Sequence, residues 1–455
     1  MPSLPRNAEM KAGQGVEFNN AVLRAANIQL SVKAGDLASL NSVGADIIQN
    51  SDYANSYARA LVNLIAKQVL MSKLYRGHFA WAKKGLLDLG EYVQEIFVNA
   101  VKGHRHDLQY AESKAFKVAY PDIRSAYHSV NLNSIYSTTV TINDIRKCFK
   151  SWNGIYDVVG GIVNALYSGA NIDEEQAIKY MLGRHVLNGD IYPVAMGTGE
   201  DAWSVAQNSA LIKEYVAKMN WNSNIYNISG VNTALEKDNF YIVVDAHFGS
   251  IIDVATLATA FNLEYVDMLV RTIVVDDFSN IDYQRLKNIF PDIQEFTTDE
   301  KSTLNKVHAM VFNGDFLQIY DETLQTTVDY VGTGPYWNYN LIKESVIAVS
   351  PFANACVFVE PTGISNTAIT LNSGSETSIK KGTYYQFKAT GTVTTGKIAS
   401  NKVEWSVSES DTKTFIDSSG LFYMSPNESQ SRVQVTAKLA QNPDITATCT
   451  ITPTA

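Results

Sequence analysis

The segment SWNGIYDVVGGIVNALYSGANIDEEQAIKYMLGRHVLNG, residues 151–189, carries the strongest helical pattern in the chain. Its apolar side chains form one stripe from Ile155 to Tyr167, and the stripe resumes from Ile178 to His185. An α-helix rises about 1.5 Å per residue. We therefore predict a helix tens of ångströms long.

On the N-terminal side of this segment the patterns are weaker. Residues 1–50 are polar and contain one short helical candidate, NNAVLRAANIQL, so we predict an extended arm. SYARALVNLIAKQVL, residues 56–70, has apolar residues at helical spacing and predicts a helix. Residues 72–142 mix charged and aromatic residues without a firm period. They predict a two-stranded ribbon that packs outside its own domain, because an isolated hairpin is only marginally stable in water.

On the C-terminal side, helical and strand patterns alternate. AWSVAQNSALIKEYVAKM predicts a helix, and the β-branched runs FYIVVDA and TIVVDDF predict buried strands with a short helix, DVATLATAFN, between them. ESVIAVSPFANACVFVEP, residues 344–361, adds two strands interrupted at Pro351. The body of the chain is therefore predicted to be α+β.

From Thr362 onward the composition changes, with abundant Ser and Thr and no helical period. PTGISNT, residues 361–367, is the predicted linker. Several short strands with one apolar face are typical of a two-sheet β-sandwich. Apolar and polar residues alternate in four runs: Tyr385–Ala389, Val403–Val407, Val433–Leu439 and Ile445–Ile451.

Composition narrows the class of protein. The 455 residues carry a net charge of -9 with a pI near 5.4, which argues against a tight nucleic-acid binder because phosphate contacts need clustered Lys and Arg. The three cysteines, Cys148, Cys356 and Cys449, are far apart and odd in number, which predicts reduced thiols. The start, MPSLPRNAEMKAGQG, has no apolar signal region, and no run reaches the roughly 20 apolar residues of a membrane span.

The motifs predict no catalytic, cofactor-binding or metal-binding site. GTVTTGKI, residues 391–398, only half-matches a phosphate-binding loop, because Ile398 stands where the loop needs a hydroxyl group. The other candidates are better explained as turns, isolated polar pairs, or core or interface packing: His104, His106 and Asp107; Asp276 and Asp277; Asp245 and His247; Tyr336, Trp337 and Tyr339.

The tail resembles the bacterial Ig-like (group 2) domain. The matching elements, in order, are AITLNSGSETSIKKGTYYQFKAT, VEWSVSE, FIDSSGLF, VQVTAKL and ITATCTITP. The resemblance implies that Gly420 supplies the turn before the next strand. It also implies a domain core that contains Trp405, Val403, Val435 and Cys449.

The body resembles the major capsid proteins of phi-29-like short-tailed phages. SWNGIYDVVGGIVNALYSGANIDE, FYIVVDAHFGSIIDVATLATAFN and YWNYNLIKESVIAVSPFANACVFV occur in the order and spacing of that family, and the Ig-like tail follows. The resemblance implies a Hong Kong 97-type phage capsid fold, which is α+β. With that fold, the expected segments are an N-terminal arm (1–50), a P-domain helix (51–71), an E-loop (72–142), a P-domain spine helix (143–190), an A-domain with returning P-domain segments (191–343), P-domain strands (344–361) and an Ig-like domain (362–455).

The resemblance implies a structural protein and not an enzyme. Copies of the chain would form hexamers and pentamers that close an icosahedral or prolate head, with the E-loop of one subunit over its neighbour. A scaffolding protein, a portal protein and double-stranded DNA held by confinement are the implied partners. The residues expected at the inter-subunit contact are Phe79, Trp81, Lys83 and Lys84 of the E-loop.

The Ig-like domain is expected on the outer surface of the head, and two roles stay open: bridging neighbouring rings, or contacting carbohydrate on the host cell. We expect the chain in the virion after synthesis in the bacterial cytoplasm, without cofactor and without membrane contact. The competing hypothesis is a bacterial surface adhesin with an Ig-like module, which predicts a signal peptide, tandem repeats and a wall anchor. An enzyme with a carbohydrate-binding appendage would need a nucleophile or a carboxylate pair.

Overall fold

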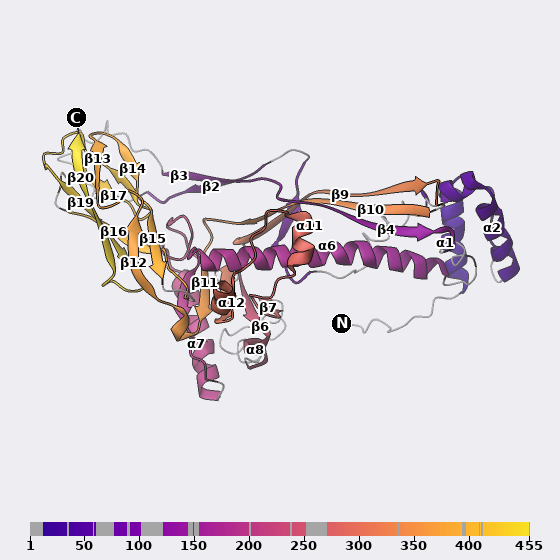
Figure 1. The fold of residues 1–455 in the computed structure, drawn as a ribbon, viewed down its shortest axis with the longest axis horizontal. Coiled ribbons are helices and arrows are strands. Elements are labelled where there is room, and N and C mark those ends of the chain that lie inside the picture. Colours follow the sequence, from indigo (N-terminus) through magenta and orange to yellow (C-terminus); the bar gives the residue numbers. More distant parts are fainter. Residues whose placement is uncertain are drawn as a thin grey trace, which may run out of the picture. The chain divides into compact units, whose positions relative to one another are not determined.

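The computed structural model describes residues 12–33, 36–57, 59–60, 77–88, 92–101, 122–143, 149, 154–199, 202–236, 239–251, 271–334, 336–393, 397–408, 410 and 413–454 (Figure 1). The chain divides into two compact units, each built from separate segments. The first unit comprises residues 1–91, 130–175 and 319–347, and the second comprises 92–129, 176–318 and 348–455.

The first unit is built around a four-stranded sheet with the order β1-β9-β10-β4. Strand β10 pairs antiparallel with β4, and β1 pairs parallel with β9. Its helices are α1 (Ala12–Ala25) and α2 (Leu37–Gln49), with the short 3-10 helix η1 (Ala80–Ala82) before β1. The strands are β1 (Lys83–Leu86), β4 (Leu132–Thr141), β9 (Leu317–Val331) and β10 (Tyr336–Val349).

The predicted extended arm over residues 1–50 is wrong, because α1 and α2 occupy most of it. Asp36 caps α2 by accepting hydrogen bonds from the backbone N–H groups of Ala38 and Ser39. Gly44 lets this helix approach Phe149, since a Cβ on Gly44 would lie 2.5 Å from the Phe149 Cβ. The helices are therefore stabilised by packing with residues distant in sequence, which a local pattern does not reveal.

The helix predicted from residue 56 onward is helical in its described part, residues 59–60 and the preceding 51–57. Residues 61–70 lie outside the described residues. The hydrophobic core of the first unit gathers side chains from its N-terminal helices and from the sheet. It includes Val22, Leu23, Leu40, Ile47, Tyr57, Trp337, Tyr339 and Leu341.

Helix α6, Gly154–Leu187, confirms the long helix predicted from residues 151–189. Its 34 residues span about 51 Å at the standard rise. Leu166 and Ala170 are buried in the core of the first unit, and Ile178, Leu182 and Val186 are buried among residues of the second.

The second unit contains a five-stranded mixed sheet with the order β5-β11-β8-β6-β7. The predicted strands FYIVVDA and TIVVDDF are β6 and β7, which pair in parallel. The predicted helix DVATLATAFN lies outside the described residues. The strands are β5 (Tyr192–Ala195), β6 (Phe240–Asp245), β7 (Thr272–Val275), β8 (Val307–Asn313) and β11 (Ala355–Val359). The helices around them are α7 (Ala202–Met219), α8 (Ala246–Ile251), α11 (Tyr283–Ile289) and α12 (Thr298–Leu304).

The two strands predicted in residues 344–361 exist as the end of β10 and as β11. They belong to different sheets, so the segment does not form one strand pair. The two-stranded ribbon also includes fewer residues than the predicted segment 72–142. Among the described residues of this segment, β2 (Val93–Val98) and β3 (Ile123–His128) form the two-stranded sheet, whereas β1 and β4 join the four-stranded sheet of the first unit.

After a short 3-10 helix at its start, the described part of residues 362–454 in the second unit consists of strands, turns and loops, which agrees with the predicted strand-rich composition. Its sheets have the orders β12-β15, β13-β20-β19-β16 and β14-β18-β17. The run predicted as one strand over Tyr385–Ala389 is split into β14 and β15. The N–H of Phe387 still donates to Gly420 O next to β18, whereas Lys388 exchanges hydrogen bonds with Asn372 at the end of β12. The strands are β12 (Asn366–Leu371), β13 (Glu376–Lys380), β14 (Tyr384–Gln386), β15 (Ala389–Val393), β16 (Val403–Val407), β17 (Phe415–Ile416), β18 (Leu421–Tyr423), β19 (Val433–Leu439) and β20 (Thr446–Thr454).

The predicted linker is ordered and packed. It begins with the 3-10 helix η3, Pro361–Gly363, and the buried Gly363 accepts a hydrogen bond from the N–H of Ile398. A Cβ on Gly363 would lie 2.5 Å from a methyl group of Val359, so a glycine is needed for this close approach. We refer to residues 362–454 as the C-terminal module.

Candidate assembly site

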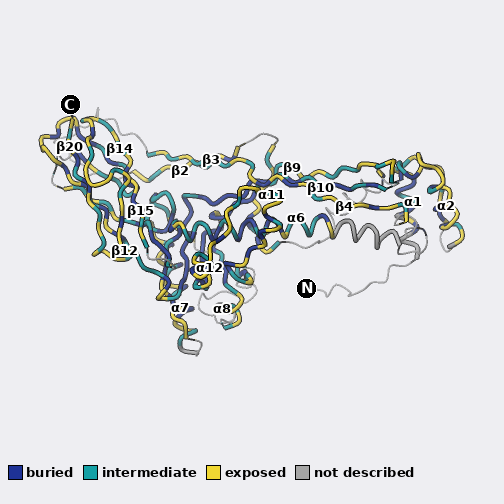
Figure 2. Tube along the Cα trace, in the orientation of Figure 1, coloured by how far each residue is buried: buried dark blue, intermediate teal, exposed yellow. Residues whose placement is uncertain are grey.

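Strands β2 and β3 form an antiparallel two-stranded ribbon in the second unit (Figure 2). Successive side chains of a strand point to opposite faces, so the register sorts the ribbon into two faces. The register pairs Phe97 with Arg124 and Val98 with Ile123. The inner face carries Val93, Glu95, Phe97, Arg124, Ala126 and His128, and the outer face carries Gln94, Ile96, Val98, Ile123, Ser125 and Tyr127.

The inner face packs on the segment that follows β10. The ring of Phe97 stacks on Phe352 with 5.5 Å between centroids. The Glu95 carboxylate accepts a hydrogen bond from Ser350 Oγ at 2.5 Å and lies 3.0 Å from His128 Nε2. An isolated hairpin is marginal in water, and these contacts supply the support that it needs.

Arg124 extends the inner face to two further parts of the unit. Its guanidinium group lies 3.2 Å from Asp417 Oδ2 of the C-terminal module and donates to Ser229 O at 3.3 Å. Arg124 Nη2 also lies 3.2 Å from Oδ2 of Asp122, the residue just before β3. Burial alone would raise the pKa of Asp122, but hydrogen bonds from Asn99 and Arg124 outweigh that effect and lower it.

The outer face of the ribbon is apolar and exposed. Ile96, Val98, Ile123 and Tyr127 expose 61%, 55%, 58% and 65% of their surface. Single exposed apolar residues are ordinary on a protein surface, but a contiguous group is typical of an interaction surface. These four side chains therefore form a surface that suits contact with another apolar surface.

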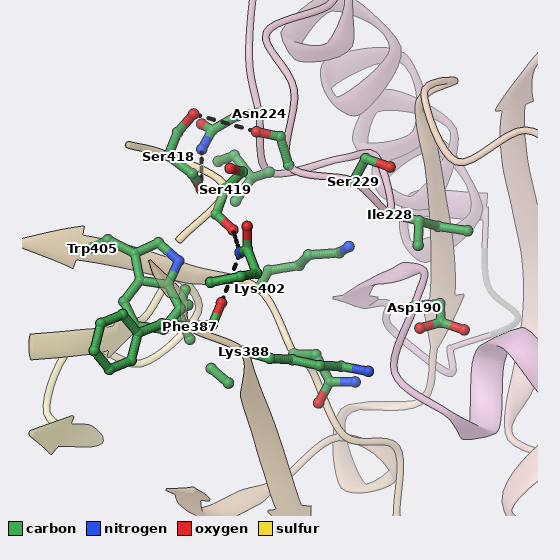
Figure 3. Close-up of a pocket in the computed structure, with 16 residues that line it drawn as sticks. Asp190, Asn224, Ile228, Ser229, Phe387, Lys388, Lys402, Trp405, Ser418 and Ser419 are labelled. Atoms are coloured by element: carbon green, nitrogen blue, oxygen red, sulfur yellow. Dashed lines mark hydrogen bonds between the residues drawn. The ribbon is translucent and has the colours of Figure 1, made fainter. Parts of the chain in front are cut away.

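A second feature of the unit is a pocket of about 330 Å³ between the C-terminal module and the loop around Asn224–Gly230 (Figure 3). Trp405 and Phe387 lie on one side, Asp190 and Ile228 lie on the other, and Lys402 crosses between them. The Lys402 ammonium group is buried and donates to Asn227 O at 2.8 Å. Burial lowers the pKa of Lys402 to about 8, and Asp190 opposes this shift.

The first unit contains an ion cluster at the start of β1, which extends from a buried pair to the exposed residue Lys83. Glu174 of α6 accepts a hydrogen bond from the Lys343 ammonium group, and both side chains are buried. Lys83 Nζ lies 3.5 Å from Glu174 Oε2 and 3.0 Å from Asp321 Oδ2. Burial would lower the pKa of Lys83, but the two carboxylates outweigh it and raise the pKa above its usual value.

The four predicted contact residues precede the ribbon. Phe79 is buried, Trp81 is half-buried, and Lys84 is exposed, whereas Lys83 belongs to the ion cluster just described. Phe79 and Lys83 are thus occupied within their own chain, and the inter-subunit role of all four residues stays a prediction.

The predicted core residues of the module lie close together. Val435 and Cys449 are fully buried in one cluster, and Trp405 packs against its edge. Val403 is half-buried beside a second cluster. Gly420 provides the expected turn before β18 with φ of +83°, and a Cβ there would lie 2.6 Å from Phe387 O.

The residues that sequence reasoning missed are the outer face of the ribbon and Arg124. The signal was present as alternation in VQEIFV and IRSAYH, but it is short and is surrounded by other polar residues. A register between two strands is needed to show that Ile96, Val98 and Ile123 share one face.

The other candidates behave as structural residues. Asp276 directly follows β7 and pairs with Lys179, while Trp337 is a core residue whose Nε1 donates to Asn55 Oδ1. His104, His106 and Asp107 lie outside the described residues. Within the described part of the chain, no group of three or more His, Cys, Asp or Glu side chains could hold a metal ion. Its helices include none that is long and apolar enough to cross a membrane.

The long helix, the mixed sheet and the ribbon form a fold that is found in phage capsids. The capsid structure of Staphylococcus phage Andhra has a similar fold, with a TM-score of 0.50 at 18% identity over 64% of this chain and 86% of that chain. The family model of the Phi29-like phage major capsid protein matches residues 20–359, and the chain belongs to this family.

Curated relatives agree with this assignment. The major capsid protein of Bacillus phage B103 is 26% identical over 439 residues, covering 94% of this chain and 91% of the relative. The major capsid protein of Bacillus phage PZA is 26% identical over 395 residues, covering 85% and 81%. The chain is therefore a phage major capsid protein, which forms the shell of the virion.

Proposed function

We propose that this chain assembles into hexamers and pentamers and that the outer face of the ribbon is one of the contacts between subunits. The observation that supports this proposal most strongly is the exposure of four large apolar side chains on one face: Ile96, Val98, Ile123 and Tyr127. The partner is a second copy of the same chain, because a shell places identical surfaces beside one another.

The energetics suit a contact of this kind. Full burial of an Ile or Val side chain contributes about 1.5–3 kcal/mol, so a few such residues make each contact weak. A shell repeats the contact many times, and many weak contacts close it without trapping misplaced subunits. Trp81 and Lys84 remain proposed contributors to the same subunit contact.

The proposal includes the expected partners of a phage head. A scaffolding protein and a portal protein assist assembly, and double-stranded DNA is held by confinement, which suits the net charge of -9. The C-terminal module is an Ig-like domain displayed on the outside of the head, where it bridges rings or contacts host carbohydrate. The protein acts as a structural component and not as an enzyme.

The test replaces two outer-face residues in the full chain, Ile96→Ser together with Ile123→Ser. We expect the fraction of chain in closed particles to fall at least tenfold, measured by sedimentation and electron microscopy after expression with and without a scaffolding protein. Val274→Ser is the matched control, because Val274 is a comparably apolar residue that is 47% exposed on the edge strand β7. Normal particle yield from the double variant would rule out the outer face as a contact.

A further inference from the structure

Arg124 joins the ribbon to the C-terminal module, although the two are nearly 300 residues apart in the chain. Its guanidinium group reaches Asp417 Oδ2 at 3.2 Å and Ser419 Oγ at 2.5 Å. Only 20% of the Arg124 side chain and 25% of the Asp417 side chain are exposed. A planar guanidinium group in this setting makes charge-assisted hydrogen bonds in fixed directions.

The module presents Asp417 in a preformed turn. Asp417 Oδ1 accepts hydrogen bonds from the N–H groups of Ser419 and Leu421, both at 2.9 Å, which leaves Oδ2 to face Arg124. Gly420 closes the turn with its positive φ of +83°. The acceptor is therefore organised by bonds within the module and does not depend on the ribbon.

The same turn is also attached to the body of the second unit. Ser418 Oγ donates to Gly230 O at 3.3 Å, and Asn224 Nδ2 donates to Ser418 O at 3.5 Å (Figure 3). Arg124 itself donates to Ser229 O in that body loop. Ribbon, body and module thus meet at one arginine.

We propose that the C-terminal module has a function in assembly: it holds Arg124 through Asp417 and Ser419 and so fixes the direction in which the ribbon presents its outer face. This inference rests on the proposed role of the outer face. The module then acts as an internal support for the assembly contact, in addition to whatever it contacts outside the shell. Arg124 is the positioning residue.

The cross-strand geometry explains why one residue has this effect. Arg124 is the register partner of Phe97, which stacks on Phe352 of the body. At this register position both strands of the ribbon are therefore anchored. Phe97 of β2 makes an aromatic contact with the body, and Arg124 of β3 makes an ionic contact with the module. Loss of the ionic contact leaves β3 without its anchor to the module, while β2 keeps its contacts with Phe352 and Ser350.

The test compares full-length, unassembled wild type with Arg124→Ala and Asp417→Asn. The Asn side chain keeps an oxygen for the turn N–H groups and removes the charge that faces Arg124. We expect backbone amides of residues 93–98 and 123–128 to exchange hydrogen at least tenfold faster in both variants. The double variant should exchange no faster than Arg124→Ala, because that single variant already removes the contact with Asp417.

Three controls separate positioning from damage to the fold. Hydrogen exchange in β19 and β20 should stay at the wild-type rate. Arg124→Lys should protect the ribbon amides better than Arg124→Ala, because lysine keeps the positive charge but lacks the planar guanidinium group. Lys438→Ala removes an exposed cation from β19 and should leave the ribbon unchanged. Wild-type ribbon exchange in Arg124→Ala would overturn the inference, as would faster exchange in β19 and β20.

Particle yield then distinguishes the two proposals. If Ile96→Ser with Ile123→Ser assembles normally while Arg124→Ala still loosens the ribbon, the outer-face contact fails and the support by the module stands. If the outer-face variant stops assembly and Arg124→Ala has no effect on ribbon exchange, the contact stands and the support fails.

Discussion

Two lysines, one in each unit, are buried to a similar degree but have different partners. Lys343 in the first unit is 2% exposed and donates to the carboxylate of Glu174. Lys402 in the second unit is 8% exposed, and the hydrogen bond of its ammonium group goes to the neutral carbonyl of Asn227. One buried charge has an anion at hydrogen-bond distance, and the other has only a dipole.

The difference shows how the two units tolerate a charge inside. In the first unit, two lysines alternate with two carboxylates, and Asp321 follows the same logic: burial would raise its pKa, but Lys83 and Lys343 outweigh that effect and lower it. In the second unit, burial dominates and lowers the pKa of Lys402 to about 8. A buried ionisable group keeps its charged form when an opposite charge lies beside it. Without such a partner, burial shifts its pKa toward the neutral form.

The largest effect is expected for Glu174→Ala. The substitution leaves the Lys343 ammonium group buried without its carboxylate and also removes a partner of Lys83. We expect the free energy of unfolding to fall by about 3–5 kcal/mol, the usual result of breaking a buried pair on one side. Urea unfolding followed by circular dichroism measures it.

The double variant Glu174→Ala with Lys343→Met sharpens this result. It removes the stranded charge together with its partner, so it should be more stable than Glu174→Ala by at least about 1 kcal/mol. Glu376→Ala, at an exposed position of β13, is the control and should change stability by less than about 0.5 kcal/mol. An equal loss in the single and double variants would show that Lys343 is not stranded.

An intermediate effect is expected for Lys402→Met, and it appears as a pH dependence. The pKa of Lys402 is lowered from 10.5 to about 8, so between these pH values the unfolded chain binds more protons than the folded one. Stability supplied by this site therefore rises with pH, by up to about 1.4 kcal/mol per unit. We compare the free energy of unfolding of the wild type with that of the variant at each pH. The difference, wild type minus variant, should increase by about 1–2 kcal/mol between pH 8 and pH 9.5.

The comparison between the two proteins is essential here. Burial raises the pKa values of Cys356, Tyr192 and Tyr226, which makes folding less favourable at high pH in both proteins. Only the difference between wild type and Lys402→Met isolates the lysine. A constant difference across this pH range would mean that Lys402 keeps its usual affinity for a proton in the folded chain.

The smallest effect is expected at an exposed pair, Glu214 and Lys218, whose side chains are 54% and 48% exposed. They lie one helical turn apart on α7, with Lys218 Nζ 2.6 Å from Glu214 Oε1. Glu214→Ala should lower stability by at most about 0.5 kcal/mol, and 0.5 M salt should remove most of that. Thermal melting at two salt concentrations measures it, and a salt-independent loss above 1 kcal/mol would contradict the comparison.

Local pattern was enough to predict the long helix, the buried strands and the strand-rich module. Helix α6 and strands β6, β7, β11, β16, β19 and β20 follow from apolar periodicity, and Gly420 marks its turn by residue type. Local pattern missed α2 and the first half of α1, and it recognised only NNAVLRAANIQL, which overlaps the end of α1, as helical. Those helices depend on contacts with distant residues such as Trp337 and Phe149.

The site was predictable in part. Sequence placed a two-stranded ribbon between residues 72 and 142, and β2 and β3 form one. The prediction that it packs outside its own domain is wrong for its inner face, which packs on Phe352 and Ser350 of the same unit. The contact residues proposed from sequence lie on the segment before it, where Phe79 is buried and Lys83 forms ion pairs. Burial and pairing of that kind arise from β9 and α6, which are far away in the sequence, so no local signal reports them.

Sequence by itself determined the family, the α+β character of the body and the separate composition of the C-terminal module, because these depend on residue type and on spacing along the chain. Only the tertiary structure decided which face of the ribbon is exposed, which carboxylate meets Arg124 and which buried lysine has a partner. The physical reason is that such facts depend on register and on distances between residues hundreds of positions apart. Spacing along the sequence does not give these distances, because folding brings such residues together.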